Sequence, residues 1–387
     1  MLTYPSLCLA LAFAGTGVAQ NIPLTSLFPA NKPAVATAPV HLFESGYAFG
    51  RWKAPIEDVR FESEVEWTHA LEQAKIKRWH YTSVNTADYL VAFTIVSLPY
   101  AAPVFVYIVD KHTAEKWEFA TNVPLSAGVH FAASSVDSAS CTSYASLWRD
   151  LSFCFDERAW HMTLDGIHVT SDRTKNKLPL SFDLSMTATD HEPLILSFPL
   201  ANDPLRPAYV HKGAGYRVHG ALTLGEKRID FSDALGAVDW TKSIALHHTE
   251  WNWVSSSFKT DDGKAVGINL SARVYDVDGA SQENALWVDG KLCLLGGVSF
   301  AVPAHPVTDT WTIRSKNATA LDAVDLEFTP VGARQEQVNV LNVVRSAFVQ
   351  PYGRFTGHIT CTMESGETHR IRLRDTFGVV EDHQALW

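Results

Sequence analysis

The strongest constraint on the fold is an alternation of apolar and polar side chains near the end of the chain. Between residues 354 and 363 every second side chain is apolar or small, namely Phe355, Gly357, Ile359, Cys361 and Met363. A period of two places successive side chains on opposite faces of a β-strand. A polar turn at residues 364–367 and a second alternating run at 368–374 follow. This region is therefore expected to form an antiparallel hairpin with one buried face.

The same period recurs along most of the chain, interrupted by short turn signals. Strands are expected at residues 88–98, 104–109, 151–155, 160–164, 167–169, 180–186, 216–224, 228–231, 265–275, 285–288 and 291–300. The dipeptides Asp165-Gly166 and Asp289-Gly290 are typical of two-residue hairpin turns, and we expect one at each place. Residues 62–75 allow a helix, with a strand as the alternative. Many short strands and little helix predict an all-β protein of barrel or sandwich type.

The length of the chain and its changes in composition predict two structural units. A chain of 387 residues is long for one domain and comfortable for two, and residues 201–215 are rich in Pro and Gly. We expect an extended lead-in at 20–45, a first β-domain at 46–205 and a second at 206–387. At the start, an apolar run ends in small residues at Gly17-Val-Ala19, which predicts a signal peptide over residues 1–19. The mature chain is thus expected to be soluble and secreted, or held in the lumen of the secretory pathway.

Charge and cysteine content limit the partners and the compartment. A net charge of −10 argues against a nucleic-acid partner. No basic run indicates an anionic membrane surface, and no later apolar stretch reaches the roughly 18–20 residues of a membrane span. Removal of the signal peptide leaves Cys141, Cys154, Cys293 and Cys361. Four cysteines are compatible with disulfides, Cys141 and Cys154 being close enough in sequence to bridge, and equally with buried free thiols.

One segment, residues 236–253, has an unusual density of aromatic and titratable side chains. It contains three Trp, two adjacent His, an Asp, a Glu and an Asn. We expect it to line a pocket enclosed by the strands. In an apolar cavity, Asp239 or Glu250 together with His247 or His248 would supply a proton donor and acceptor, because desolvation separates their pKa values. The alternative is that Asp239 caps a turn and that both histidines are ordinary surface or core groups.

The spacing within this segment bears on the kind of site. In a strand, Trp251 and Trp253 lie on one face and Asn252 on the other. Such a Trp pair makes either an apolar lining or a surface that stacks on sugars, and we favour the lining because large exposed apolar surface lowers solubility. His247 and His248 point to opposite faces and cannot easily share one ion, so no metal is predicted. No nucleophile elbow or phosphate-cradling glycine loop is present, and no cofactor is predicted.

These considerations give a set of predicted site residues. The predicted catalytic residues are Asp239, Glu250 and His248. The predicted ligand-binding residues are Trp240, Lys242, His247, Trp251, Asn252, Trp253, Glu283, Asn284, Arg354 and His383. We also expect Arg354 and Glu381 to form a buried ion pair that closes the barrel.

Several separated motifs resemble the domain-of-unknown-function 2804 family. They are Lys77-Arg-Trp79-His-Tyr81, Tyr216-Arg-Val-His219-Gly220, Asp239-Trp240-Thr-Lys242, Trp251-Asn252-Trp253, Glu283-Asn284-Ala-Leu286, Gly353-Arg354-Phe355-Thr-Gly357 and Glu381-Asp-His383-Gln-Ala385-Leu-Trp387. The resemblance covers most of residues 45–387. It implies tandem lipocalin-like barrels, related to hydratase-type and cyclase-type proteins that hold hydrophobic small molecules. The chain departs from the family pattern at Lys242, where an Arg is usual and planar bidentate recognition is lost, and at His247 and His248.

The fold expected from residues and resemblance together is two lipocalin-like antiparallel β-barrels or sandwiches in tandem. The expected partner is a hydrophobic or amphipathic small molecule. One hypothesis is a cofactor-free hydratase, isomerase or cyclase that uses Asp239 or Glu250 as a buried acid. The alternative is a non-catalytic lipid or small-molecule carrier in which the same residues orient the ligand. A carbohydrate-active protein is the third and least favoured hypothesis.

Overall fold

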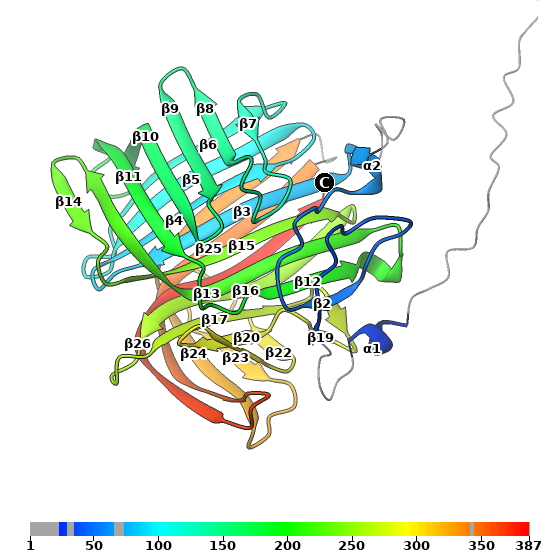
Figure 1. The fold of residues 1–387 in the computed structure, drawn as a ribbon. Helices are drawn as coiled ribbons and strands as arrows, with labels where there is room; N and C mark the ends of the chain where they lie inside the picture. The colour runs from blue at the N-terminus through cyan, green and yellow to red at the C-terminus, as the bar shows by residue number, and fades with distance from the viewer. Residues whose placement is uncertain (1–22, 29–34, 66–72, 341–343, 387) are drawn as a thin grey trace, which may run out of the picture.

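The computed structural model describes residues 23–28, 35–65, 73–340 and 344–386, and these form an almost entirely β-stranded molecule (Figure 1). The predicted signal peptide lies outside the described residues. The described residues include two short α-helices, α1 (Leu24–Leu27) and α2 (Glu62–Val65), and a 3-10 helix, η2 (Leu200–Asn202). Of these, α2 occupies the start of the segment for which a helix or a strand was expected. The prediction of an all-β fold is confirmed. Within the part of the chain that is described, no helix is long and apolar enough to cross a membrane.

The first sheet contains a closed barrel. Its strands are β1 (Val35–Ala36), β2 (Gly50–Trp52), β3 (Ile76–Asn85), β4 (Tyr89–Ser97), β5 (Ala101–Asp110), β6 (Lys116–Pro124), β7 (Val129–His130), β8 (Thr142–Ser146), β9 (Arg149–Phe155), β10 (Ala159–Ser171), β11 (Lys177–Thr187), β12 (Leu194–Pro199), β13 (Pro207–Leu224), β14 (Lys227–Asp230) and β15 (Ala234–Ile244). Antiparallel pairing runs through β13, β15, β3, β4, β5, β6, β10 and β11 and returns to β13. A closed antiparallel ring of eight strands is the lipocalin-like architecture.

Alternate side chains of these strands fill the interior of the first barrel. Phe93 of β4 lies between the rings of Phe153 and Phe182, with centroids 5.3 and 4.8 Å away. Leu164 of β10 and Val218 of β13 belong to the same buried cluster. The inside of this barrel is therefore a packed hydrophobic core, which leaves the opposite face of each strand to contact other parts of the molecule.

The second sheet curls into a half-barrel beside the first (Figure 1). Its strands are β16 (His248–Lys259), β17 (Ala265–Ala272), β20 (Ala285–Val288), β21 (Lys291–Leu294), β22 (Val298–Ala301), β23 (Trp311–Ser315), β24 (Asp322–Val340), β25 (Val344–Thr362) and β26 (Thr368–Leu386). A separate small pair consists of β18 (Asp276–Val277) and β19 (Ala280–Ser281). The alternating region near the C-terminus forms the antiparallel pair β25 and β26, as predicted. The hollow side of this sheet packs its own core, which includes Trp311, Phe328 and Phe355.

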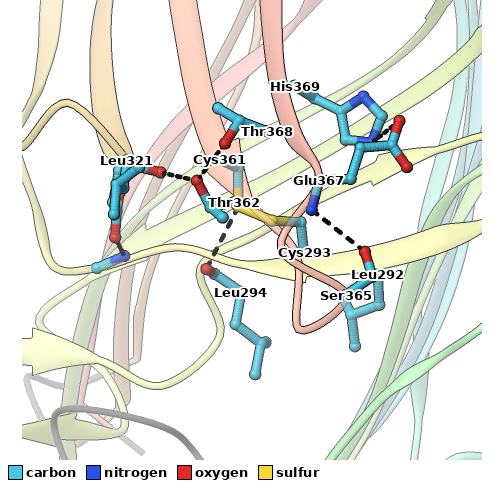
Figure 2. The surroundings of a disulfide bond; sticks show 12 residues. Leu292, Cys293, Leu294, Leu321, Cys361, Thr362, Ser365, Glu367, Thr368 and His369 are labelled. Atoms are coloured by element: carbon cyan, nitrogen blue, oxygen red, sulfur yellow. Dashed lines mark hydrogen bonds and ion pairs between the residues drawn. A yellow bond between two sulfur atoms is a disulfide. The ribbon is translucent and has the colours of Figure 1, made fainter.

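Two disulfides pair the four cysteines that follow the predicted signal peptide, Cys141 with Cys154 and Cys293 with Cys361. The second lies in the core of the half-barrel, with both residues about 1% exposed. It joins β21, at one edge of the nine-stranded sheet, to β25 (Figure 2). Since the ends of this sheet are not hydrogen-bonded to each other, the disulfide supplies a covalent tie across its curled part.

One of the two predicted hairpin turns is wrong. The turn at Asp289-Gly290 joins β20 to β21 as expected, but β10 runs continuously through Asp165-Gly166. The register against β11 shifts between Leu164 and Ile167. Gly166 has a φ of +67°, and a Cβ there would lie 1.6 Å from a backbone oxygen of a neighbouring strand connection. The glycine therefore serves a bulge and a close backbone approach rather than a chain reversal.

The chain passes from the first sheet to the second between β15 and β16, inside the segment 236–253. β13, β14 and β15 follow residue 205 in sequence but pair within the first sheet. The expected boundary at residue 206 therefore does not coincide with the change of sheet, because the last strands of the first barrel are contributed after it. A division into folding domains at that position stays a prediction.

Candidate functional site

A cavity of about 1120 Å³ lies between the first barrel and the half-barrel. Along β4, Thr94 lines the cavity while Phe93 belongs to the core of the first barrel. Along β16, Trp253 lines the cavity while Val254 belongs to the core of the half-barrel. Successive strand residues point to opposite faces, so the cavity faces the outer side of both sheets. The expected pocket inside a barrel is thus replaced by one between two barrels.

Aromatic side chains from both sheets form the walls of this cavity. Trp79 of β3 stacks on Trp251 of β16 with ring centroids 5.9 Å apart. Tyr81 of β3 meets Trp253 of β16 edge to face at 5.2 Å. Because these pairs join β3 to β16, the wall is built at the contact between the two sheets. Large apolar faces of this kind suit a hydrophobic ligand body.

A buried cluster of charged groups lies on one side of the cavity. The Lys212 ammonium of β13 contacts Asp239 of β15 at 2.8 Å and Glu283, which precedes β20, at 3.4 Å. Thr241 donates a hydrogen bond to Asp239 at 3.1 Å, and Ser271 donates one to Glu283 at 3.1 Å. All three charged side chains are nearly inaccessible to solvent, so their charges interact through a medium of low polarisability.

Lys212 and Glu283 titrate differently because their surroundings are unequal. Burial lowers the pKa of Lys212, but Asp239 and Glu283 together outweigh burial and hold that pKa above its ordinary value. Burial raises the pKa of Glu283 to about 7, and Lys212 offsets this only in part. The contact between Lys212 and Asp239 is the shorter of the two, at 2.8 Å compared with 3.4 Å. Glu283 is left as a carboxyl group that can exchange a proton near neutral pH.

A second carboxyl group, Glu381 of β26, also lines the cavity. Its Oε1 accepts a hydrogen bond from the Trp251 indole at 2.7 Å, and its Oε2 accepts one from the Gln350 amide at 2.8 Å. Tyr107 donates in turn to the amide oxygen of Gln350 at 2.7 Å. Burial raises the pKa of Glu381 to about 7, and the two donors lower it by less. Both carboxylate oxygens are thus held in place while the group remains able to carry a proton.

Seven of the predicted site residues line the cavity, namely Asp239, His248, Glu250, Trp251, Trp253, Glu283 and His383. They differ in burial. Glu250 is partly exposed and bonded to Arg273, whose hydrogen bond lowers the pKa of Glu250. His248 is exposed at the start of β16. His383 is buried, and burial lowers the pKa of its imidazole to about 3. Asp239, Glu283 and His383 are thus deep in the site, and Glu250 and His248 are at its margin.

Trp240 and Lys242 lie on the opposite face of β15 and do not line the cavity. Asp239, Thr241 and Ser243 face the cavity instead. Trp240 packs between the rings of aromatic residues at the end of the first barrel. Lys242 is bonded to Glu64 and to a backbone carbonyl at 2.9 Å. The period of two separates the members of the Asp-Trp pair, because adjacent strand residues cannot share one face.

Three further predicted residues have other environments. His247 is exposed and is not part of the cavity lining. Asn252 donates to Asp382 at 2.8 Å, on the far side of β16 from its two neighbouring tryptophans. Asn284 accepts a hydrogen bond from the Ser271 backbone at 2.7 Å and so joins the segment before β20, which contains Glu283, to β17.

The expected ion pair between Arg354 and Glu381 is wrong. Arg354 pairs with Asp375 at 2.8 Å and donates to a backbone carbonyl at 2.8 Å. The register of β25 and β26 places Arg354 opposite Phe377. Glu381 is therefore roughly 13 Å further along β26, at about 3.3 Å per residue. The two side chains are too far apart to meet.

The sequence analysis did not predict that Lys212 lines the cavity. It also did not predict this position for Glu381, or for Trp79 and Tyr81 of β3. Lys212 had a usable signal, because it is a charged residue in the otherwise mostly apolar run at 207–216, which becomes β13. A charge inside a buried strand requires partners. The identity of those partners depends on the pairing of strands that are distant in sequence.

The fold and the site define an all-β protein with a lipocalin-like barrel, a half-barrel and a cavity between them that is lined in part by buried carboxyl groups. The chain belongs to the DUF2804 family, a domain of unknown function whose model matches residues 41–387. No curated protein matches the chain. The family therefore leaves the activity open, and the geometry of the cavity carries the functional conclusion.

The solved structures that are similar to this chain include the following three. Kievitone hydratase from Nectria haematococca has 10% sequence identity and a TM-score of 0.40, over 79% of this chain and 88% of that one. A candidate AttH from Nitrosomonas europaea has 14% identity and a TM-score of 0.44, over 85% and 98% of the two chains. CghA has 10% identity and a TM-score of 0.44, over 79% and 87%.

Proposed function

We propose that this protein binds a hydrophobic or amphipathic small molecule in the cavity between its barrels and catalyses a cofactor-free proton transfer on it. Hydration, isomerisation and cyclisation are the reaction types of this kind. The observation that carries the proposal is the position of Glu381, Glu283 and the Lys212–Asp239 pair beside an aromatic wall.

The binding part of the proposal rests on size and lining. A cavity of about 1120 Å³ is at or slightly above the usual range of small-molecule sites, roughly 300–1000 Å³. Trp79, Trp251 and Trp253 offer apolar faces, while Lys212, Asp239 and Glu283 form a charged cluster on one side of the cavity. A ligand with an apolar body and one polar end matches this division.

The catalytic part rests on the two carboxyl groups with raised pKa values. A carboxylic acid with a pKa near 7 is partly protonated at neutral pH and can donate a proton, whereas Asp239, paired with Lys212, can accept one. In a hydration, the acid gives its proton to one carbon of a double bond, and water adds its oxygen to the other carbon. A carboxylate then takes the proton that this water releases. A pure carrier has no need for two such acids, which favours catalysis over the carrier hypothesis.

The test begins with the compounds that co-purify with the protein, identified by native mass spectrometry and extraction and then assayed for turnover. We expect Glu381→Gln to lower turnover by about 100-fold or more, while affinity for the neutral probe Nile red changes by less than about threefold. Asp276→Asn, which removes a carboxylate at another part of the lining, is the matched control and should retain turnover. Unchanged turnover in both Glu381→Gln and Asp239→Asn would reject catalysis and leave the carrier. Failure of Nile red to bind would reject the site itself.

A further inference from the structure

Carboxylates outnumber cations around the cavity. Among the described lining residues, the carboxylates are Asp239, Glu250, Asp276, Glu283, Glu336 and Glu381. The lysines and arginines of the same lining are Lys212, Arg273 and Arg334. A ligand that enters therefore meets an excess of groups that are negative or can become so.

Each of the three cations is already engaged by two carboxylates. Lys212 contacts Asp239 and Glu283 at 2.8 and 3.4 Å. Arg273 is paired with Glu250 and lies 3.7 Å from Asp382. Arg334 contacts Glu118 at 2.9 Å and Glu336 at 2.6 Å. Among the described lining residues, a ligand anion would find no lysine or arginine whose charge is not already balanced, and burying it beside these pairs would be costly.

The arginine deepest in this lining is further occupied by stacking. The Arg334 guanidinium is 3.9 Å from the ring centre of Phe105 and 5.1 Å from that of Phe348. Its side chain is about 3% exposed. These contacts fix the guanidinium group against two rings, so it is not free to form two parallel hydrogen bonds to a ligand carboxylate.

Uncharged hydrogen-bonding groups are available in contrast. Thr94 lines the cavity, and its buried hydroxyl has no hydrogen-bond partner among the described residues. The Glu381 carboxyl group faces the same space and has no salt-bridge partner in the described part of the chain. Both can bond a ligand hydroxyl or carbonyl without a change in net charge.

Building on the proposed function, we propose that the substrates are uncharged amphiphiles whose polar end is a hydroxyl or carbonyl group. Fatty acids and other carboxylates are excluded. The basis is the complete pairing of the lining cations together with the unpaired carboxylates. The cavity therefore selects by charge at its polar end and by apolar contact along its tryptophan wall.

A matched pair of probes tests this selection. Binding of octan-1-ol and of octanoate is measured at pH 8 by displacement of Nile red and by calorimetry, on the full chain. We expect octan-1-ol to bind at least about tenfold more tightly, since only octanoate places a charge beside unpaired carboxylates. Equal or tighter binding of octanoate would overturn the inference and leave the proposed binding function standing. Binding of neither compound nor of Nile red would reject the proposed function as well.

A gain of anion binding identifies the responsible cation. Glu283→Gln leaves Lys212 with a single carboxylate partner, and we expect octanoate affinity to rise by about tenfold while octan-1-ol affinity stays within about twofold. Asp150→Asn removes an exposed carboxylate of β9 that is not part of the cavity lining and is the control. An equal gain in both variants, or none in Glu283→Gln, would overturn the assignment to the paired lysine.

Discussion

At the scale of single residues, the most informative group is Glu381. Two neutral donors hold its oxygens, and no described cation balances its charge. Its pKa is about 7 in the folded protein, compared with an ordinary value of 4.5. Between pH 4.5 and 7, Glu381 is therefore mostly protonated in the folded protein and mostly deprotonated in the unfolded chain. Stability contributed by the protonated group is complete below about pH 4.5 and is lost as the pH rises through 7.

We expect this linkage to be visible in Glu381→Gln. The quantity to compare is the free energy of unfolding of the wild type minus that of the variant. This difference should be smaller at pH 8 than at pH 4.5, by on the order of 2–3 kcal/mol. Urea unfolding at several pH values measures the difference. Burial lowers the pKa values of His80 and His211 to about 3, so these two residues make the folded state more stable as the pH rises. Both are present in the wild type and in the variant, and their contributions cancel in the difference. A difference that does not change with pH would contradict the protonated state of Glu381.

Some of the residues that line the cavity could be predicted from the sequence, and others could not. The density of aromatic and acidic residues at 236–253 correctly drew attention to Asp239, Trp251 and Trp253, which all line the cavity. Their functional roles stay predictions. Lys212 was overlooked because its partners come from β15 and from the segment before β20. Ion pairs between distant strands depend on sheet register, which local spacing does not encode.

At the scale of elements, alternation predicted strands well but did not fix what lies on each face. The period of two placed Trp251 and Trp253 together, whereas the Asp-Trp pair at 239–240 was assigned to one pocket and is divided between two faces of β15. The dipeptide Asp165-Gly166 has the composition of a turn but forms an irregularity within β10. Turn residues and bulge residues are alike in sequence, because both need a positive φ.

The disulfide between β21 and β25 gives a prediction at this scale. Replacement of both Cys293 and Cys361 by Ser opens a loop of 68 residues and should lower the free energy of unfolding by about 3–5 kcal/mol. The same replacement at Cys141 and Cys154, 13 residues apart, is the control and should cost less, because a shorter loop restricts the unfolded chain less. Guanidinium unfolding of both variants measures this. If the double replacement at Cys293 and Cys361 lowered the free energy of unfolding no more than the replacement at Cys141 and Cys154, the proposed role of the Cys293–Cys361 disulfide in holding the half-barrel together would be contradicted.

At the scale of the whole molecule, the proposed function depends on the contact between two β-units rather than on either interior. The first barrel and the half-barrel each pack a core of their own, and the cavity occupies the space between their outer faces. Sequence patterns predicted the strands and, through the family resemblance, the tandem arrangement. They could not place the cavity, because the relative position of two packed sheets follows from side chains across the whole contact.

The most direct test is to locate a bound ligand by crystallography. We would use 8-bromooctan-1-ol, an uncharged amphiphile whose bromine gives an anomalous signal at a single position. The bromine or its chain is expected between β3 and β16, against Trp79 and Trp251, with the hydroxyl directed toward Glu381 or Thr94. A bromine peak inside the core of the first barrel, beside Phe93 and Phe182, or on the outer surface alone, would contradict a ligand site between the barrels.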